Sequence, residues 1–203
     1  MSDENTVFWK KIEEIEGLSL QIGLNHVSGQ KENYEKSLKL IMKEIDKNDN
    51  TLVSLLESGD MHGFSTMIHG MKGTLAFIGT EELSAKARNL EKAANLEDKD
   101  FCALNLPVFL EGINKLKNSL TEAFKLKPAP QGPSEKPPEL ALILQKLTIA
   151  FNETDFSAID DGIKSLDALK LGGELYEEIE KIKDAVLVME YETALEIIGN
   201  MVT

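Results

Sequence analysis

Apolar residues recur at alternating steps of four and three along almost the whole chain, and this spacing constrains the fold more than any other feature. One clear run has its apolar residues on a single face of a helix: Phe64, Ile68, Met71, Leu75 and Ile78. Alternation at period two, which is typical of half-buried strands, is scarce. The sequence therefore predicts an all-α protein.

A proline-rich stretch interrupts the helical pattern between residues 127 and 138. It holds five of the six prolines in the chain, and a segment of that composition is extended and semi-rigid. We expect a helical domain over 1–126, a linker over 127–138 and a small helical module over 139–203. That module is near the lower size limit for an independent bundle, so docking on a neighbour or a second copy would suit it.

The periodicity predicts a set of helices in each part of the chain. In the first domain we expect helices over 6–16, 30–47, 52–57, 60–79, 80–94 and 100–125, with a short turn over 18–24. Asp49-Asn50-Thr51 should break the second of these helices, and Pro107 should delay or kink the last one. Four long helices with short connections favour an antiparallel up-down four-helix bundle. In the second module we expect helices over 140–151, 156–169, 173–188 and 190–202.

His69 is the residue with the strongest functional signal. It follows Ile68 of the apolar stripe, so its ring should stand about 100° around the helix, at the edge of the buried face. Lys72 and Gly73 lie three and four residues later and are its neighbours on the helix surface. A helical glycine costs about 0.5–1 kcal/mol relative to alanine, and both Gly70 and Gly73 lie within this turn. A compensating role for them is expected.

The run His69-Gly70-Met71-Lys72-Gly73, followed by Gly79, resembles the His-x-x-Lys-Gly signature of histidine phosphotransfer (HPt) domains. The similarity covers roughly residues 8–125, from Ile15-Glu16-Gly17-Leu18 to Leu90-Glu91. It implies an HPt-like four-helix bundle in which His69 takes a phosphoryl group from the aspartate of one receiver domain and passes it to another. It also implies that Lys72 neutralises the phosphoryl oxygens and that Gly73 lets receiver loops approach the ring.

The sequence has no glycine-rich phosphate loop, no nucleotide-binding motif and no acidic triad for magnesium. We therefore expect a phosphohistidine carrier and not an enzyme, without a cofactor or metal of its own. Magnesium is expected only in the partner receiver. The expected partners are response-regulator receiver domains, a hybrid sensor histidine kinase, or both.

Simpler interpretations exist for each of these residues. A histidine beside an apolar stripe is usually a half-buried polar group, an exposed lysine is usually only solvated, and close packing of another helix would also favour Gly73. His62 reads as a surface residue, and His26 lies in a turn with no site pattern. Two other functions also stay open: a helical docking adaptor or inhibitor that carries no phosphate, and a metal- or ligand-binding bundle.

The composition of the chain excludes some classes of function. The net charge of −13 argues against a nucleic-acid or anionic-membrane partner, both of which require basic patches. Cys102 is the single cysteine, so no disulfide forms within the chain, and we expect this side chain to be buried. The polar start of the chain and the absence of a long apolar run predict a cytoplasmic protein.

The two halves share a short similarity. Residues 60–68 align with residues 155–163, each starting at an aspartate and having apolar residues at matching steps. This register places Lys164 opposite His69, so the second module has no histidine at that point. The module could be a degenerate copy of the first bundle, although such a helix start also recurs by chance.

Overall fold

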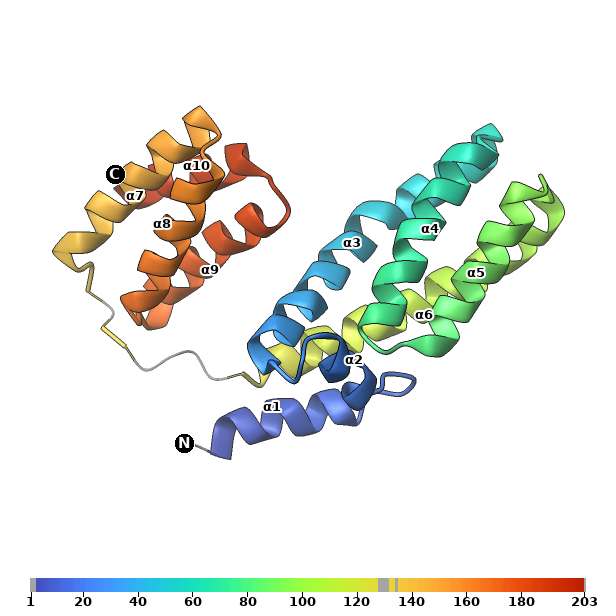
Figure 1. Ribbon diagram of the computed structural model, residues 1–203, viewed down its shortest axis with the longest axis horizontal. Helices are drawn as coiled ribbons and strands as arrows, with labels where there is room; N and C mark the ends of the chain where they lie inside the picture. Colours follow the sequence, from blue (N-terminus) through green and yellow to red (C-terminus); the bar gives the residue numbers. More distant parts are fainter. Residues whose placement is uncertain (1–2, 128–131, 134, 203) are drawn as a thin grey trace. The chain divides into compact units, whose positions relative to one another are not determined.

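The structure is a computed structural model that describes residues 3–127, 132–133 and 135–202 (Figure 1). Its regular structure is helical and, over those ranges, includes no strand, so the all-α prediction is confirmed. The chain divides into two compact units, Met1–Lys127 and Pro128–Thr203. Residues 128–131 and 134 of the predicted linker lie outside the described part.

The first unit is built around four helices that lie side by side (Figure 1). Its elements are α1 (Asp3–Glu13), α2 (Leu20–His26), α3 (Lys31–Ser58), α4 (Met61–Phe77), α5 (Glu81–Asn95) and α6 (Lys99–Lys125). From α3 to α6 each helix contacts the next along the chain, and α6 also contacts α3. The helix that carries His69, α4, is thus flanked by α3 and α5 and keeps one long face exposed.

The core of the first unit follows the predicted stripes. All five residues of the α4 run, from Phe64 to Ile78, are fully buried. Cys102 is buried as predicted, and burial raises the pKa of its thiol. At the α1 end the core is aromatic, since the ring of Phe8 lies 4.8 Å from Trp9 and 5.1 Å from Phe124.

The predicted break at Asp49-Asn50-Thr51 is wrong, because α3 continues from Lys31 to Ser58. Leu52 is fully buried seven residues after buried Ile45, so the apolar stripe crosses the polar run without a gap. Burial of a leucine is worth about 1.5–3 kcal/mol. A weak helix former costs only up to about 0.7 kcal/mol. The Thr51 hydroxyl also donates to the Lys47 carbonyl, 3.1 Å away.

The structure also differs from the prediction at α1, at α2 and at Pro107. Helix α1 covers residues 3–13 and not 6–16, and the expected turn at 18–24 includes the helix α2, whose N-cap is Ser19. Pro107 does not delay α6, which begins at Lys99 after the N-cap Asp98. A proline frees the carbonyl four residues earlier, and here that residue, Ala103, is exposed, so water can bind its oxygen.

The turn between α4 and α5 is held by hydrogen bonds from Ser19 and Tyr34. The Ser19 amide donates to the Gly79 carbonyl at 2.9 Å, and the Tyr34 hydroxyl donates to the Ile78 carbonyl at 2.7 Å. Desolvation raises the pKa of this tyrosine. Thr80 is the N-cap residue of α5, but its hydroxyl makes no capping bond and donates back to the Leu75 carbonyl at 2.8 Å. These contacts fix where α4 ends.

The second unit contains the four helices predicted for it, with small differences at their ends. They are α7 (Pro138–Glu153), α8 (Phe156–Ala168), α9 (Gly173–Leu187) and α10 (Tyr191–Val202). Helix α7 contacts α8 and α10, and α10 contacts α9, around a separate core that includes Leu147, Ile182 and Ala194.

Candidate functional site

His69 lies on the exposed face of α4, near the middle of the helix. The helix begins at Met61 after the N-cap Asp60, whose carboxylate accepts a hydrogen bond from the Gly63 amide at 2.9 Å. Ile68 is fully buried, whereas the His69 side chain is 69% exposed. Consecutive residues lie about 100° apart around a helix, so Ile68 faces the core and His69 faces the solvent.

A carboxylate from the neighbouring helix holds this ring. Oε1 of Glu91, on α5, lies 2.6 Å from Nδ1 of His69, and the Glu91 side chain is only 15% exposed. Two lone pairs would repel at that distance, so Nδ1 carries the proton and donates it to the carboxylate. The other ring nitrogen, Nε2, is then unprotonated in the neutral ring and is free to act as a nucleophile.

Lys72 completes a triad of charged and polar groups with these two residues. Its ammonium lies 2.6 Å from Oε2 of Glu91 and 3.3 Å from Nδ1 of His69. Since Nδ1 donates to Glu91, the lysine acts here as a charge beside the ring and not as a donor to it. The ammonium has three donor hydrogens, so its pairing with Glu91 leaves others for a second anion.

The hydrogen bonds of the triad change the protonation of Glu91. Donation from Lys72, and next from His69, lowers the pKa of this carboxyl. Because the pKa of Glu91 is lowered in the folded state, these hydrogen bonds stabilise the folded state at pH values above the ordinary pKa of a glutamate. This contribution disappears as the pH falls and Glu91 becomes protonated. At neutral pH the carboxylate is charged and the triad is intact.

Two polar contacts set the register between α4 and α5 on either side of the triad. The Ser84 hydroxyl donates to the Lys72 carbonyl at 3.0 Å, and the Ser65 hydroxyl donates to the Asn95 side-chain oxygen at 2.7 Å. Ser65 and Ser84 are both buried, and the two bonds are partly buried between the helices. The position of Glu91 relative to His69 is therefore fixed by the packing of the two helices.

Gly73 lies beside the triad with open space above it. A Cβ atom at this position would meet no atom within 4 Å. Close packing of another helix was the simpler explanation for this glycine, and it does not apply to the described residues. His69, Lys72 and Gly73 are thus brought together on one exposed surface, as the sequence predicted.

Glu91 had no predicted role, although this residue is part of the HPt resemblance. The missed signal is its position directly after buried Leu90, as His69 comes directly after buried Ile68. In antiparallel neighbours such edge positions face each other. The apolar pattern of each helix does not specify that α4 and α5 are adjacent.

The other two histidines lie apart from this triad. His62 is exposed in the first turn of α4, as expected. His26 had no predicted role, but its Nδ1 lies 2.8 Å from the Phe77 carbonyl and its ring stacks on Phe77 at 5.3 Å. His26 therefore joins α2 to the end of α4. No group of three potential metal ligands occurs among the residues that the structure describes.

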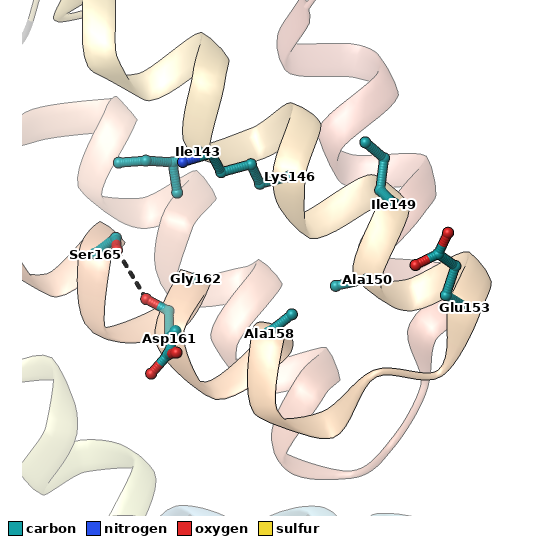
Figure 2. Close-up of a pocket in the computed structure, with 9 residues that line it drawn as sticks. All are labelled: Ile143, Lys146, Ile149, Ala150, Glu153, Ala158, Asp161, Gly162 and Ser165. Carbon is teal, nitrogen blue, oxygen red and sulfur yellow. Dashed lines mark hydrogen bonds between the residues drawn. The ribbon is translucent and has the colours of Figure 1, made fainter.

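A groove of about 360 Å³ lies between α7 and α8 in the second unit (Figure 2). Its lining residues are Ile143, Lys146, Ile149, Ala150, Glu153, Ala158, Asp161, Gly162 and Ser165. The Ser165 hydroxyl donates to the Asp161 carbonyl in the same helix at 2.7 Å, so it has no activating base. Lys164, the counterpart of His69, pairs with Asp160 at 2.5 Å. Neither feature provides a nucleophile.

Comparisons with models of known families, with curated proteins and with solved structures find no match to this chain. Within the described ranges, none of the helices is both long enough and apolar enough to cross a bilayer. The function is therefore inferred from the geometry of the triad and from the resemblance of its sequence to the HPt signature.

The Glu91 contact leads to a prediction for the tautomer of His69. Replacing Glu91 by alanine removes the acceptor for Nδ1–H, so the neutral ring should lose its preference for protonation at Nδ1. The ¹⁵N chemical shifts of the ring at alkaline pH measure this preference directly. Glu82→Ala is the matched control, because Glu82 is also on α5 but pairs with Lys86 at 2.9 Å. Identical shifts in wild type and Glu91→Ala would contradict the assignment.

Proposed function

We propose that the first unit is a phosphohistidine carrier of the HPt type, in which His69 exchanges a phosphoryl group with the aspartates of receiver domains. The observation that carries this proposal is the clamp on Nδ1 by Glu91 at 2.6 Å, with the ring otherwise 69% exposed. A tautomer with Nδ1 protonated presents the Nε2 lone pair to a partner. The contacts of α3, α4, α5 and α6, each with the next and α6 with α3, support the same assignment.

The transfer step uses groups from both proteins. The Nε2 lone pair attacks the phosphorus of an aspartyl phosphate, the N–P bond forms, and the P–O bond to the aspartate breaks. The aspartate leaves with the electron pair as a carboxylate. The phosphorylated ring keeps its proton on Nδ1 and becomes positively charged, and the adjacent Glu91 carboxylate stabilises that charge.

The lysine acts on the phosphoryl group. Lys72 is 23% exposed at the edge of the triad, where its ammonium can turn from Glu91 toward a phosphoryl oxygen. Magnesium belongs to the receiver, which supplies the rest of the charge stabilisation for phosphoryl transfer. The proposed partners are receiver domains or a hybrid sensor histidine kinase, and the proposed location is the cytoplasm.

The test is transfer of labelled phosphoryl from charged receiver domains to the purified chain. We expect label that is labile in acid and stable in alkali, and that maps to the peptide containing His69. A receiver that binds the chain equally well before and after charging, and never transfers label, would instead indicate a docking adaptor without a phosphoryl group.

A further inference from the structure

The two sides of the His69 ring differ in what surrounds them. On the α5 side, Glu91 and Lys72 occupy the space next to the imidazole. On the other side Gly73 and Gly70 lie about 40° and 100° around α4 from His69. A Cβ atom at either glycine would meet no atom within 4 Å. On that side a partner that approaches Nε2 meets no side chain at these two positions.

Gly70 has no explanation within the fold. Gly23 differs from it, since a Cβ at that position would overlap the Tyr34 ring. Gly70 has open space instead and a helical conformation that alanine adopts more readily. A glycine at this position therefore destabilises the helix, and none of the described residues packs into the space that it leaves.

We propose that Gly70 is a specificity-determining position for the phosphotransfer partner. This inference rests on the proposed function of His69. The bare backbone at Gly70, continuous with Gly73, lets the receiver loops that surround its phosphorylated aspartate lie against α4 beside the imidazole. A side chain at position 70 would hold those loops away from the helix and lengthen the distance from Nε2 to phosphorus.

The distance matters because phosphoryl transfer depends on positioning. A displacement of about 1 Å can cost on the order of a hundredfold in rate, even when the reacting groups are unchanged. Gly70 acts on the approach of a protein and not on the ring itself. A donor without a protein surface should therefore be insensitive to position 70.

The experiment compares two donors on the full chain. We expect Gly70→Ala to slow transfer from a charged receiver about threefold and Gly70→Leu about tenfold or more. Labelling by phosphoramidate, a small donor, should be unchanged in both variants. Gly70→Ala should also raise the unfolding midpoint, because alanine favours the helix. Gain of stability together with loss of transfer is not expected from a purely structural role.

The matched control is Gly199→Ala in α10, another exposed helical glycine with open space at its Cβ. It should be neutral or stabilising and should leave both labelling rates unchanged. Wild-type transfer rates in both Gly70 variants would overturn this inference while leaving the phosphocarrier function intact. Equal slowing with receiver and phosphoramidate would also overturn it, because Gly70 would then act through the ring. Failure of receivers to label the wild type would count against the proposed function itself.

Discussion

Replacing His69 by glutamine is expected to reduce phosphoryl labelling to background, by more than about a thousandfold. Glutamine keeps a polar side chain at the same surface position but has no nucleophilic ring nitrogen. Because His69 is 69% exposed, the change in unfolding free energy should be within about 0.5 kcal/mol. Quantitative labelling by charged receivers, with circular dichroism to establish folding, measures both effects.

His62→Gln provides the matched control for this result. His62 is exposed on the same helix, seven residues before His69, and should be labelled at the wild-type rate after substitution. Label that persists in His69→Gln and disappears in His62→Gln would move the site to the first turn of α4. Equal labelling of the two variants would exclude both as the single acceptor.

Gly79→Ala should produce the largest loss of stability, about 3 kcal/mol. Gly79 has φ +87°, a conformation that costs an L-residue about 1–2 kcal/mol. A Cβ at this position would also overlap the carbonyl oxygen of Ser19, and a backbone atom cannot move aside without disturbing α2. Chemical unfolding of the full chain measures the change.

Gly29→Ala separates the two contributions to this loss. Gly29 also has a positive φ, of +75°, but a Cβ there would meet no atom within 4 Å. Its substitution should therefore cost only the backbone term, about 1–2 kcal/mol. A Gly79→Ala variant no less stable than Gly29→Ala would show that the contact between Ser19 and Gly79 does not constrain the α4–α5 turn.

Much of the fold could be predicted from the sequence where a local signal and the apolar period agree. The α4 helix has an aspartate cap, an unbroken stripe and a terminal glycine, and its extent was predicted closely. The predicted break before Leu52 is wrong because it was inferred from the polar residues 49–51 alone. The burial of Leu52, which keeps the helix continuous, depends on neighbouring helices. The helix at residues 20–26 was not expected, since its contacts are with distant residues: Gly23 packs against the Tyr34 ring and His26 contacts the Phe77 carbonyl.

The candidate site shows the same division. His69, Lys72 and Gly73 belong to one helix, so their spacing alone placed them together. The carboxylate that fixes the ring comes from α5, 22 residues later, and depends on the adjacency and register of two helices. Open space above Gly73 was implied by the HPt resemblance, but no sequence pattern indicated the open space above Gly70. Whether a position is open depends on the packing of the other helices.

The aromatic cluster at α1 has a consequence for observing the molecule. Trp9 is the single tryptophan of the chain, it is 8% exposed, and its ring stacks with Tyr34 at 6.3 Å. The emission of an indole ring changes when the ring becomes exposed to water. Tryptophan fluorescence therefore reports the packing of α1 and the unfolding of the first unit alone. Far-ultraviolet dichroism, in contrast, sums the helices of both units. The chain thus carries a built-in optical label that distinguishes unfolding of the histidine-bearing unit from unfolding of its neighbour.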